Sequence, residues 1–119
     1  MSALSPSLSQ EVNQLHADIC SALADPTRIL LLYTLSESPR TVNELTVEFG
    51  VPQSTISRHL KTLRERGLVI ATRKGQTVEY SLADERLIQA LDLLREVLRD
   101  GVLRRAVVMQ EVELNQESE

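Results

Sequence analysis

Apolar residues near the start of the chain recur at every third or fourth position. The intervals are four, three and four residues in the set Leu8, Val12, Leu15 and Ile19. This spacing places the side chains on one face of a helix, and the alternation is typical of a seam between helices. The same intervals return near the other end, in the set Leu87, Leu91, Leu94 and Leu98. The pattern predicts a helix at each end of the chain, each with one apolar face.

Start signals for two further helices lie between these stripes. Asp25 is an N-cap carboxylate directly before Pro26, and proline is favoured at the first helical position. A helix is therefore expected from Pro26 to about Ser36, with a buried face drawn from Ile29, Leu30, Tyr33 and Leu35 or their neighbours. Thr41 and Glu44 have the spacing of a capping box, which predicts a short helix that ends at Gly50 and buries Leu45 and Phe49.

A longer helix and a hairpin should follow. The helix is expected over residues 53–66, with Gly67 ending it and an apolar face formed by Ile56, Leu60 and Leu63. Residues 68–73 and 77–82 are rich in β-branched side chains and are joined by the basic, glycine-containing stretch 74–76, so they should form a hairpin. The last helix should begin at Ala83 or Asp84 and weaken at Gly101, with residues 102–109 as a candidate continuation.

Together these elements predict one fold. Two helices joined by a tight turn and followed by a hairpin form a winged helix-turn-helix. We therefore expect a mostly α protein with a small β-hairpin wing, in the order ααααββα. The 119 residues suffice for one domain, expected over residues 8–109. A flexible N-terminal segment over residues 1–7 and an acidic C-terminal tail over residues 110–119 should flank this domain.

The distribution of charge matters more than its sum. The net charge of −4 argues, by itself, against a polyanionic partner. Residues 53–76, however, contain six basic residues and one acid, a net charge of +5, whereas the remainder contains seven basic and sixteen acidic residues, a net charge of −9. A basic segment in an acidic body is typical of a surface that contacts a phosphate backbone.

The predicted helix over residues 53–66 is narrow enough to enter the major groove of DNA, where its N-terminal residues would meet the base edges. Short polar side chains and one arginine at this end suit mixed contacts with bases and phosphates. Side chains one turn further along and at the hairpin tip could reach the flanking backbone or the minor groove. The candidate DNA-binding residues are Gln53, Ser54, Thr55, Ser57, Arg58, Lys61, Thr62, Arg73, Lys74 and Gln76.

Three motifs, in this order, resemble the ArsR-type (arsenic-repressor-like) bacterial transcriptional regulators. Residues 22–31 resemble the opening of that family, residues 53–63 its recognition helix, and residues 67–69 with 75–82 its wing. The resemblance covers about residues 10–105. It implies a homodimer that binds a palindromic operator as a repressor, with the first and last helices forming the interface. It also implies that a bound ligand typically lowers the affinity for DNA.

The two leucine-rich seams favour a dimer independently of the resemblance. They are more than one small winged-helix core can cover, and a two-fold dimer would bury them while setting two recognition helices about 34 Å apart, one turn of DNA. Packing of the seams on each other within one chain is the alternative. The candidate interface residues are Leu8, Val12, Leu15, Ile19, Leu87, Leu91, Leu94 and Leu98.

The chain departs from metal-sensing and redox-sensing members of that family. Thr46 and Glu48 stand where metal sensors carry cysteines on the third helix, and neither is a soft ligand. Other members place zinc ligands on the last helix, but residues 84–110 contain no histidine. Their carboxylates alone would make a poor zinc site, in the set Asp84, Glu85, Asp92 and Glu96. With one cysteine, Cys20, a disulfide within the chain is excluded.

One metal hypothesis stays open. His16 and Cys20 are four residues apart on one helix face, so two copies could supply two histidines and two cysteines to a zinc ion. The alternatives for Cys20 are a buried packing role or a redox response of its single thiol. For His59, packing or a phosphate contact is favoured over metal binding. We therefore predict no resident metal or cofactor, and the sequence identifies no inducer.

Other function classes are less well supported. The sequence has no glycine-rich phosphate loop, no metalloprotease helix and no GxSxG motif, so an enzyme is not expected. It has no apolar run long enough for a membrane helix and no signal-peptide pattern, which favours a cytoplasmic protein. The competing hypothesis to a DNA-binding regulator is a winged helix that serves as a protein–protein interaction module. Such a module should expose apolar or acidic residues where this chain is basic.

Overall fold

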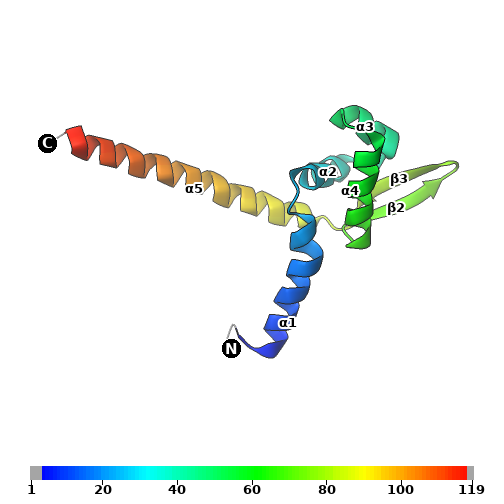
Figure 1. The fold of residues 1–119 in the computed structure, drawn as a ribbon, viewed down its shortest axis with the longest axis horizontal. Helices are drawn as coiled ribbons and strands as arrows, with labels where there is room; N and C mark the ends of the chain where they lie inside the picture. Colours follow the sequence, from blue (N-terminus) through cyan, green and yellow to red (C-terminus); the bar gives the residue numbers. More distant parts are fainter. Residues whose placement is uncertain (1–3, 118–119) are drawn as a thin grey trace. The chain divides into compact units, whose positions relative to one another are not determined.

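The computed structural model describes residues 4–117 and contains the predicted helices and hairpin in the predicted order (Figure 1). The chain divides into two compact units, with the boundary between Glu85 and Arg86. The second unit is built from α5 (Arg86–Glu117). The first unit contains α1 (Pro6–Leu15), the π-helix η1 (His16–Cys20), α2 (Pro26–Glu37), α3 (Val42–Phe49) and α4 (Gln53–Glu65), with the strands β1 (Arg40–Thr41), β2 (Val69–Lys74) and β3 (Thr77–Leu82).

The first helix begins earlier than expected and changes type at its end. Ser5 caps it by accepting a hydrogen bond from the Leu8 amide at 3.4 Å, and Pro6 starts the first turn. The expected flexible segment over residues 1–7 therefore overlaps α1, and its residues 1–3 lie outside the described part of the chain. At its C-terminal end the helix widens into η1, where the Ser21 amide donates to the His16 carbonyl. Such π-helical turns are rare and are frequent at functional sites.

The start of α2 is confirmed, but its buried face is rotated from the prediction. The Asp25 carboxylate accepts a hydrogen bond from the Thr27 amide at 2.8 Å. The buried residues are Leu31, Leu32 and Leu35, whereas the predicted core residue Leu30 is 57% exposed. The helix contacts both α4 and β3, so it buries a wide arc. Because the sequence around Leu30 is apolar on all sides, it does not define the centre of that arc.

The helix α3 shows the predicted capping box and ends at Gly50 in the left-handed conformation, with φ +63°. The Thr41 hydroxyl accepts from the Glu44 amide at 3.2 Å, and the Glu44 carboxylate accepts from the Thr41 amide at 3.2 Å. Thr41 also belongs to the unpredicted strand β1, which pairs antiparallel with β3 and gives a three-stranded sheet in the order β1-β3-β2. A strand of two residues is too short to show an alternating pattern.

We expect the Thr41→Ala substitution to lower the free energy of unfolding by about 1 kcal/mol, the usual cost of removing an N-cap hydroxyl. The backbone pairing of β1 needs no side chain and should persist. Urea denaturation followed by circular dichroism measures the change. Thr34→Ala is the control, because the Thr34 hydroxyl only donates to a carbonyl within α2. Equal stability of the two variants would show that the capping box contributes nothing.

The helix α4 is anchored by its apolar face and closed by glycine. Ile56, Leu60 and Leu63 are fully buried, as predicted. The Gly67 amide donates to the Arg64 carbonyl at 3.0 Å and the Leu68 amide donates to the Leu63 carbonyl at 2.9 Å, with Gly67 at φ +76°. These two bonds form a Schellman motif, which explains the glycine. The motif turns the chain directly into β2, so α4 and the hairpin lie side by side (Figure 1).

The hairpin is confirmed and its turn is tight. Val69 pairs with Leu82 at the base and Lys74 with Thr77 at the tip, which leaves Gly75 and Gln76 as the connection. Gly75 has φ +63°, the conformation that a two-residue turn with glycine at its first position requires. The tip projects beyond the core, as the wing of this fold does (Figure 1).

The helix α5 is one continuous helix from Arg86 to Glu117. It passes through Gly101, where the sequence predicted a weak point, and it occupies most of the segment expected as an acidic tail over residues 110–119. One glycine costs only about 1 kcal/mol inside a helix, and good helix formers follow it. Within the described residues, no helix combines the length and apolar character that a membrane span requires.

Candidate nucleic-acid interface

The outward face of α4 is polar and basic along its whole length. The helix presents to solvent, opposite its buried apolar residues, the side chains of Gln53, Ser54, Ser57, Arg58 and Lys61. The remaining two candidates on the helix, Thr55 and Thr62, are half-buried, and the Thr62 hydroxyl donates to the Arg58 carbonyl at 3.3 Å. The structure therefore places five of the predicted residues on one open surface and turns Thr55 and Thr62 to its edge.

The first turn of α4 is open to an acceptor from outside. Pro52 occupies the N-cap position, and its ring offers no oxygen that could cap the amides of the turn. A helix N-terminus carries partial positive charge and amides that point away from the helix, which suits a phosphate oxygen.

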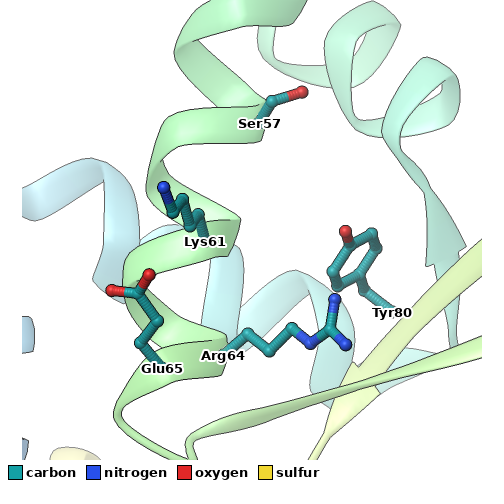
Figure 2. Close-up of a pocket in the computed structure, with 5 residues that line it drawn as sticks. All are labelled: Ser57, Lys61, Arg64, Glu65 and Tyr80. Carbon is teal, nitrogen blue, oxygen red and sulfur yellow. The ribbon is translucent and has the colours of Figure 1, made fainter.

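An open hollow of about 480 Å³ lies between α4 and β3 (Figure 2). Its lining consists of Ser57, Lys61, Arg64, Glu65 and Tyr80. Figure 2 shows the Arg64 guanidinium extending toward the Tyr80 ring, with the Ser57 side chain on the same flank of α4. Two cationic groups and two hydroxyls around one hollow are donors that a phosphate group can accept from.

Two residues of this surface, Arg64 and Tyr80, are not among the candidates predicted from the sequence. Arg64 lies in the basic segment over residues 53–76 but was not included as a DNA-binding residue. Its spacing of seven residues from Ser57 and three from Lys61 places all three on one flank of the helix, which is the signal that could have identified it. For Tyr80 the sequence offers no equivalent signal, because its position depends on how the hairpin packs beside α4.

The tip of the wing exposes the remaining three candidates, Arg73, Lys74 and Gln76. The Lys74 ammonium lies 3.1 Å from the Glu79 carboxylate on the neighbouring strand, and the Arg73 guanidinium donates to the Gly75 carbonyl at 3.4 Å. Glu79 lies just outside the segment whose charge was counted as +5, so the wing is less basic than the sequence segment suggests. Of the two cations at the tip, Lys74 is paired with a carboxylate, whereas Arg73 contacts only a backbone carbonyl, so Arg73 provides most of the unneutralised positive charge.

His59 faces inward and is not part of the exposed surface. The residue is 6% exposed, and its Nδ1 lies 3.3 Å from Nη1 of Arg28 on α2. Burial lowers the pKa of His59, with smaller contributions from Arg28 and Arg58, while Asp25 acts in the opposite direction. Of the two roles expected for this histidine, packing is confirmed and the phosphate contact is wrong.

The residues considered as sensor ligands are dispersed or already hydrogen-bonded. Thr46 donates to the Val42 carbonyl at 2.8 Å, and Glu48 accepts from the Arg40 guanidinium at 2.8 Å. Cys20, expected to be buried, is exposed, because Ala22 rather than Cys20 enters the core at the end of η1. Among the described residues, no group of three or more His, Cys, Asp or Glu side chains could hold a metal ion.

Most of the proposed interface residues are exposed in the single chain. They include Leu8, Val12, Leu15, Leu94 and Leu98, whereas Ile19 and Leu87 are half-buried and Leu91 is 5% exposed. On α5 the exposed apolar residues continue past Leu98, at Val102, Leu103, Val107, Val108, Met109, Val112 and Leu114. A single helix with this much exposed apolar surface is typical of a protein interface.

Comparison with known proteins agrees with this geometry. Residues 25–71 match the family described as "Bacterial regulatory protein, arsR family". The chain is 43% identical to the HTH-type transcriptional regulator CmtR of Mycobacterium bovis over 77 residues, which are 65% of each chain, so it spans just under two thirds of that relative. It is 37% identical to the HTH-type transcriptional repressor SmtB of Mycobacterium tuberculosis over 94 residues, 78% of this chain and 70% of SmtB.

Two solved structures share the fold over most of their length. The crystal structure of NolR from Sinorhizobium fredii superposes with a TM-score of 0.70 at 35% identity, covering 82% of this chain and 96% of NolR. The homodimeric winged helix-turn-helix DNA-binding domain of Mb0332 from Mycobacterium bovis superposes with a TM-score of 0.70 at 28% identity, covering 84% and 92%. The winged helix-turn-helix fold expected from the sequence is thus confirmed, and the chain belongs to the arsR family of bacterial regulatory proteins.

Proposed function

We propose that this protein is a sequence-specific DNA-binding transcriptional regulator that acts as a dimeric repressor on a palindromic operator. The observation that carries the proposal is the outward face of α4, where polar and basic side chains form one continuous exposed surface opposite a fully buried apolar face. A helix with this division can enter the major groove without losing its hold on the core. The proposed activity is non-covalent binding of DNA, in which no covalent bond is made or broken. The proposed location of the protein is the cytoplasm.

The contacts divide by position along the interface. The short side chains at the start of α4, Gln53, Ser54 and Ser57, are placed for base edges together with Arg58. Lys61 lies one turn further along and suits a phosphate, as do Arg64 and Tyr80 across the hollow. The wing over residues 72–78 contacts the flanking backbone through Arg73, with Lys74 and Gln76 beside it. Thr55 and Thr62 support these contacts from the edge of the surface.

The dimer follows from the exposed apolar faces of α1 and α5. A two-fold axis would bury these faces and present two copies of α4 to successive major grooves, about 34 Å apart. The Mb0332 domain, which shares this fold, is homodimeric. The exposed residues of α5 beyond Gly101 extend the available apolar surface past the seam that the sequence indicated.

The decisive experiment is fluorescence anisotropy with DNA from upstream of the protein's own gene, compared with a scrambled duplex of equal length. A repressor should bind the first duplex more tightly at near-physiological salt. The alternative, a winged helix used only for protein–protein interaction, predicts equal and weak binding of both duplexes.

The salt dependence of binding provides a second, quantitative prediction. The dimer offers at most ten cationic contacts, five from each protomer, at Arg58, Lys61, Arg64, Arg73 and Lys74. Counterion release then gives a slope of log K against log salt no steeper than about −9. The ion pair between Lys74 and Glu79 should make the measured slope shallower than this limit. Anisotropy titrations at four salt concentrations give the value, and a slope near zero would contradict a phosphate-contacting interface.

A further inference from the structure

The side chain of Arg28 connects three parts of the first unit. Arg28 lies in the first turn of α2, and its Nε donates to the Ala22 carbonyl at 2.7 Å. Its Nη2 donates to the Ser21 carbonyl at 3.3 Å, and its Nη1 lies 3.3 Å from Nδ1 of His59 on α4. One planar guanidinium therefore holds both the backbone that follows η1 and the buried side of α4. Arginine suits this role because its donors form a rigid fork.

A second contact ties the same segment to the end of α4. The Arg66 guanidinium donates to the Asp18 carboxylate of η1 at 3.2 Å. The segment between Asp18 and Ala22 is thus attached to α4 at two places, through His59 and through Arg66. This segment continues directly from α1, whose exposed apolar face is the proposed dimer surface.

We propose that Arg28 is a positioning residue for DNA binding, which sets the placement of α4 through His59 and transmits the position of the segment after α1 to the recognition helix. The inference rests on the proposed function. Arg28 is placed behind α4, on the side of the buried His59 rather than on the exposed face, so its effect on DNA binding is indirect.

The contact imposes a condition on the protonation of His59. Arginine can only donate, so Nδ1 of His59 must offer its lone pair, and the imidazole must be neutral with its proton on Nε2. A protonated ring would instead face the cations of Arg28 and Arg58, with Asp25 as the one opposing charge among the groups that act on it. Burial holds the pKa of His59 below its ordinary value of 6.5, which keeps the ring neutral at physiological pH.

The sign of the resulting pH dependence is specific. While His59 is buried against Arg28 its pKa is lowered, whereas a His59 displaced from this contact into solvent would titrate near 6.5. Acid therefore favours the displaced arrangement, and operator affinity should fall as the pH drops below about 6.5, by up to about tenfold per protomer at pH 5.5. General electrostatics predicts the opposite trend, because protonation makes the protein more positive and strengthens its attraction to DNA.

The test measures operator affinity by anisotropy at pH 7.5, 6.5 and 5.5 for the full chain and three variants. His59→Gln replaces the imidazole by an amide whose oxygen can accept from Arg28 without titrating, so it should bind operator at pH 7.5 and lack the acid-dependent loss. Arg28→Lys keeps the charge but not the fork, and should bind about tenfold more weakly at pH 7.5. Arg40→Lys is the matched control, since Arg40 is a partly buried arginine that contacts Glu48 and Ser38 instead of α4.

A readout without DNA separates this inference from the proposed function. The imidazole proton resonances of His59 report its pKa by NMR. His59 should titrate below 6.5 in the unaltered chain and closer to 6.5 in Arg28→Lys. Specific operator binding at pH 7.5 with the same pH profile in the unaltered chain and in His59→Gln would overturn the inference alone. Failure to bind any operator, with the expected NMR titration, would overturn the proposed function and leave the link between Arg28 and His59 established.

Discussion

The Leu94→Asp variant is expected to be monomeric and to lose detectable binding of the operator. Leu94 is 60% exposed in the single chain and lies in the middle of the apolar stripe of α5. In the proposed dimer, its replacement would bury a carboxylate without a partner in an apolar interface, which is strongly unfavourable. Because two half-sites must be bound together, a monomer would keep only the weak affinity of one recognition helix.

Sedimentation velocity gives the oligomeric state of this variant, and anisotropy gives its affinity for the operator. Gln89→Asp is the control, because it adds the same charge to the same helix at an exposed position about half a turn away from the apolar stripe. The control should remain dimeric. A Leu94→Asp protein that still sediments as a dimer would place the interface elsewhere.

The second large effect is expected for Arg58→Ala, which should weaken operator binding by about 1–3 kcal/mol, or roughly 5- to 150-fold. Arg58 is exposed on the first turns of α4, on the side opposite the buried residues. Removal of one base-reading arginine should also reduce discrimination at a single position of each half-site.

The matched control for Arg58→Ala is Arg99→Ala, which removes the same charge from an exposed position of α5. Its affinity should be nearly unchanged at physiological salt, since the charge lies outside the interface. Both proteins should sediment as dimers and unfold at the same urea concentration. Loss of dimerisation in Arg58→Ala would mean that α4 has been assigned the wrong role.

The parts of the fold that were predicted correctly depend on chemistry within a few residues. The capping box of Thr41 and Glu44, and Gly67 after α4, each satisfy helix-end groups with partners close in sequence. The same holds for the outward face of α4, because an alternation of polar and apolar residues at helical spacing fixes which side is buried. Five of the seven candidate residues on α4 are accordingly exposed.

The features that were missed depend on contacts between distant segments. The strand β1 forms through the pairing of Arg40 with Tyr80, a residue 40 positions away in the sequence. A strand of two residues is too short for an alternating pattern that would predict it. The buried face of α2 could not be located in a run of apolar residues without knowing that α4 and β3 both contact it. The hollow beside Tyr80 likewise forms only when the hairpin lies against α4.

Thr41 belongs to two elements at once, and this limits how the protein can be altered. Its backbone pairs with Glu79 of the wing, while its side chain and amide close the first turn of α3. Thr41 therefore connects the wing directly to the helix pair α3 and α4. A chimera that exchanges α3 and α4 to redirect operator preference should consequently keep Arg40 and Thr41 of the recipient, since a junction placed after Thr41 preserves the spacing between recognition helix and wing.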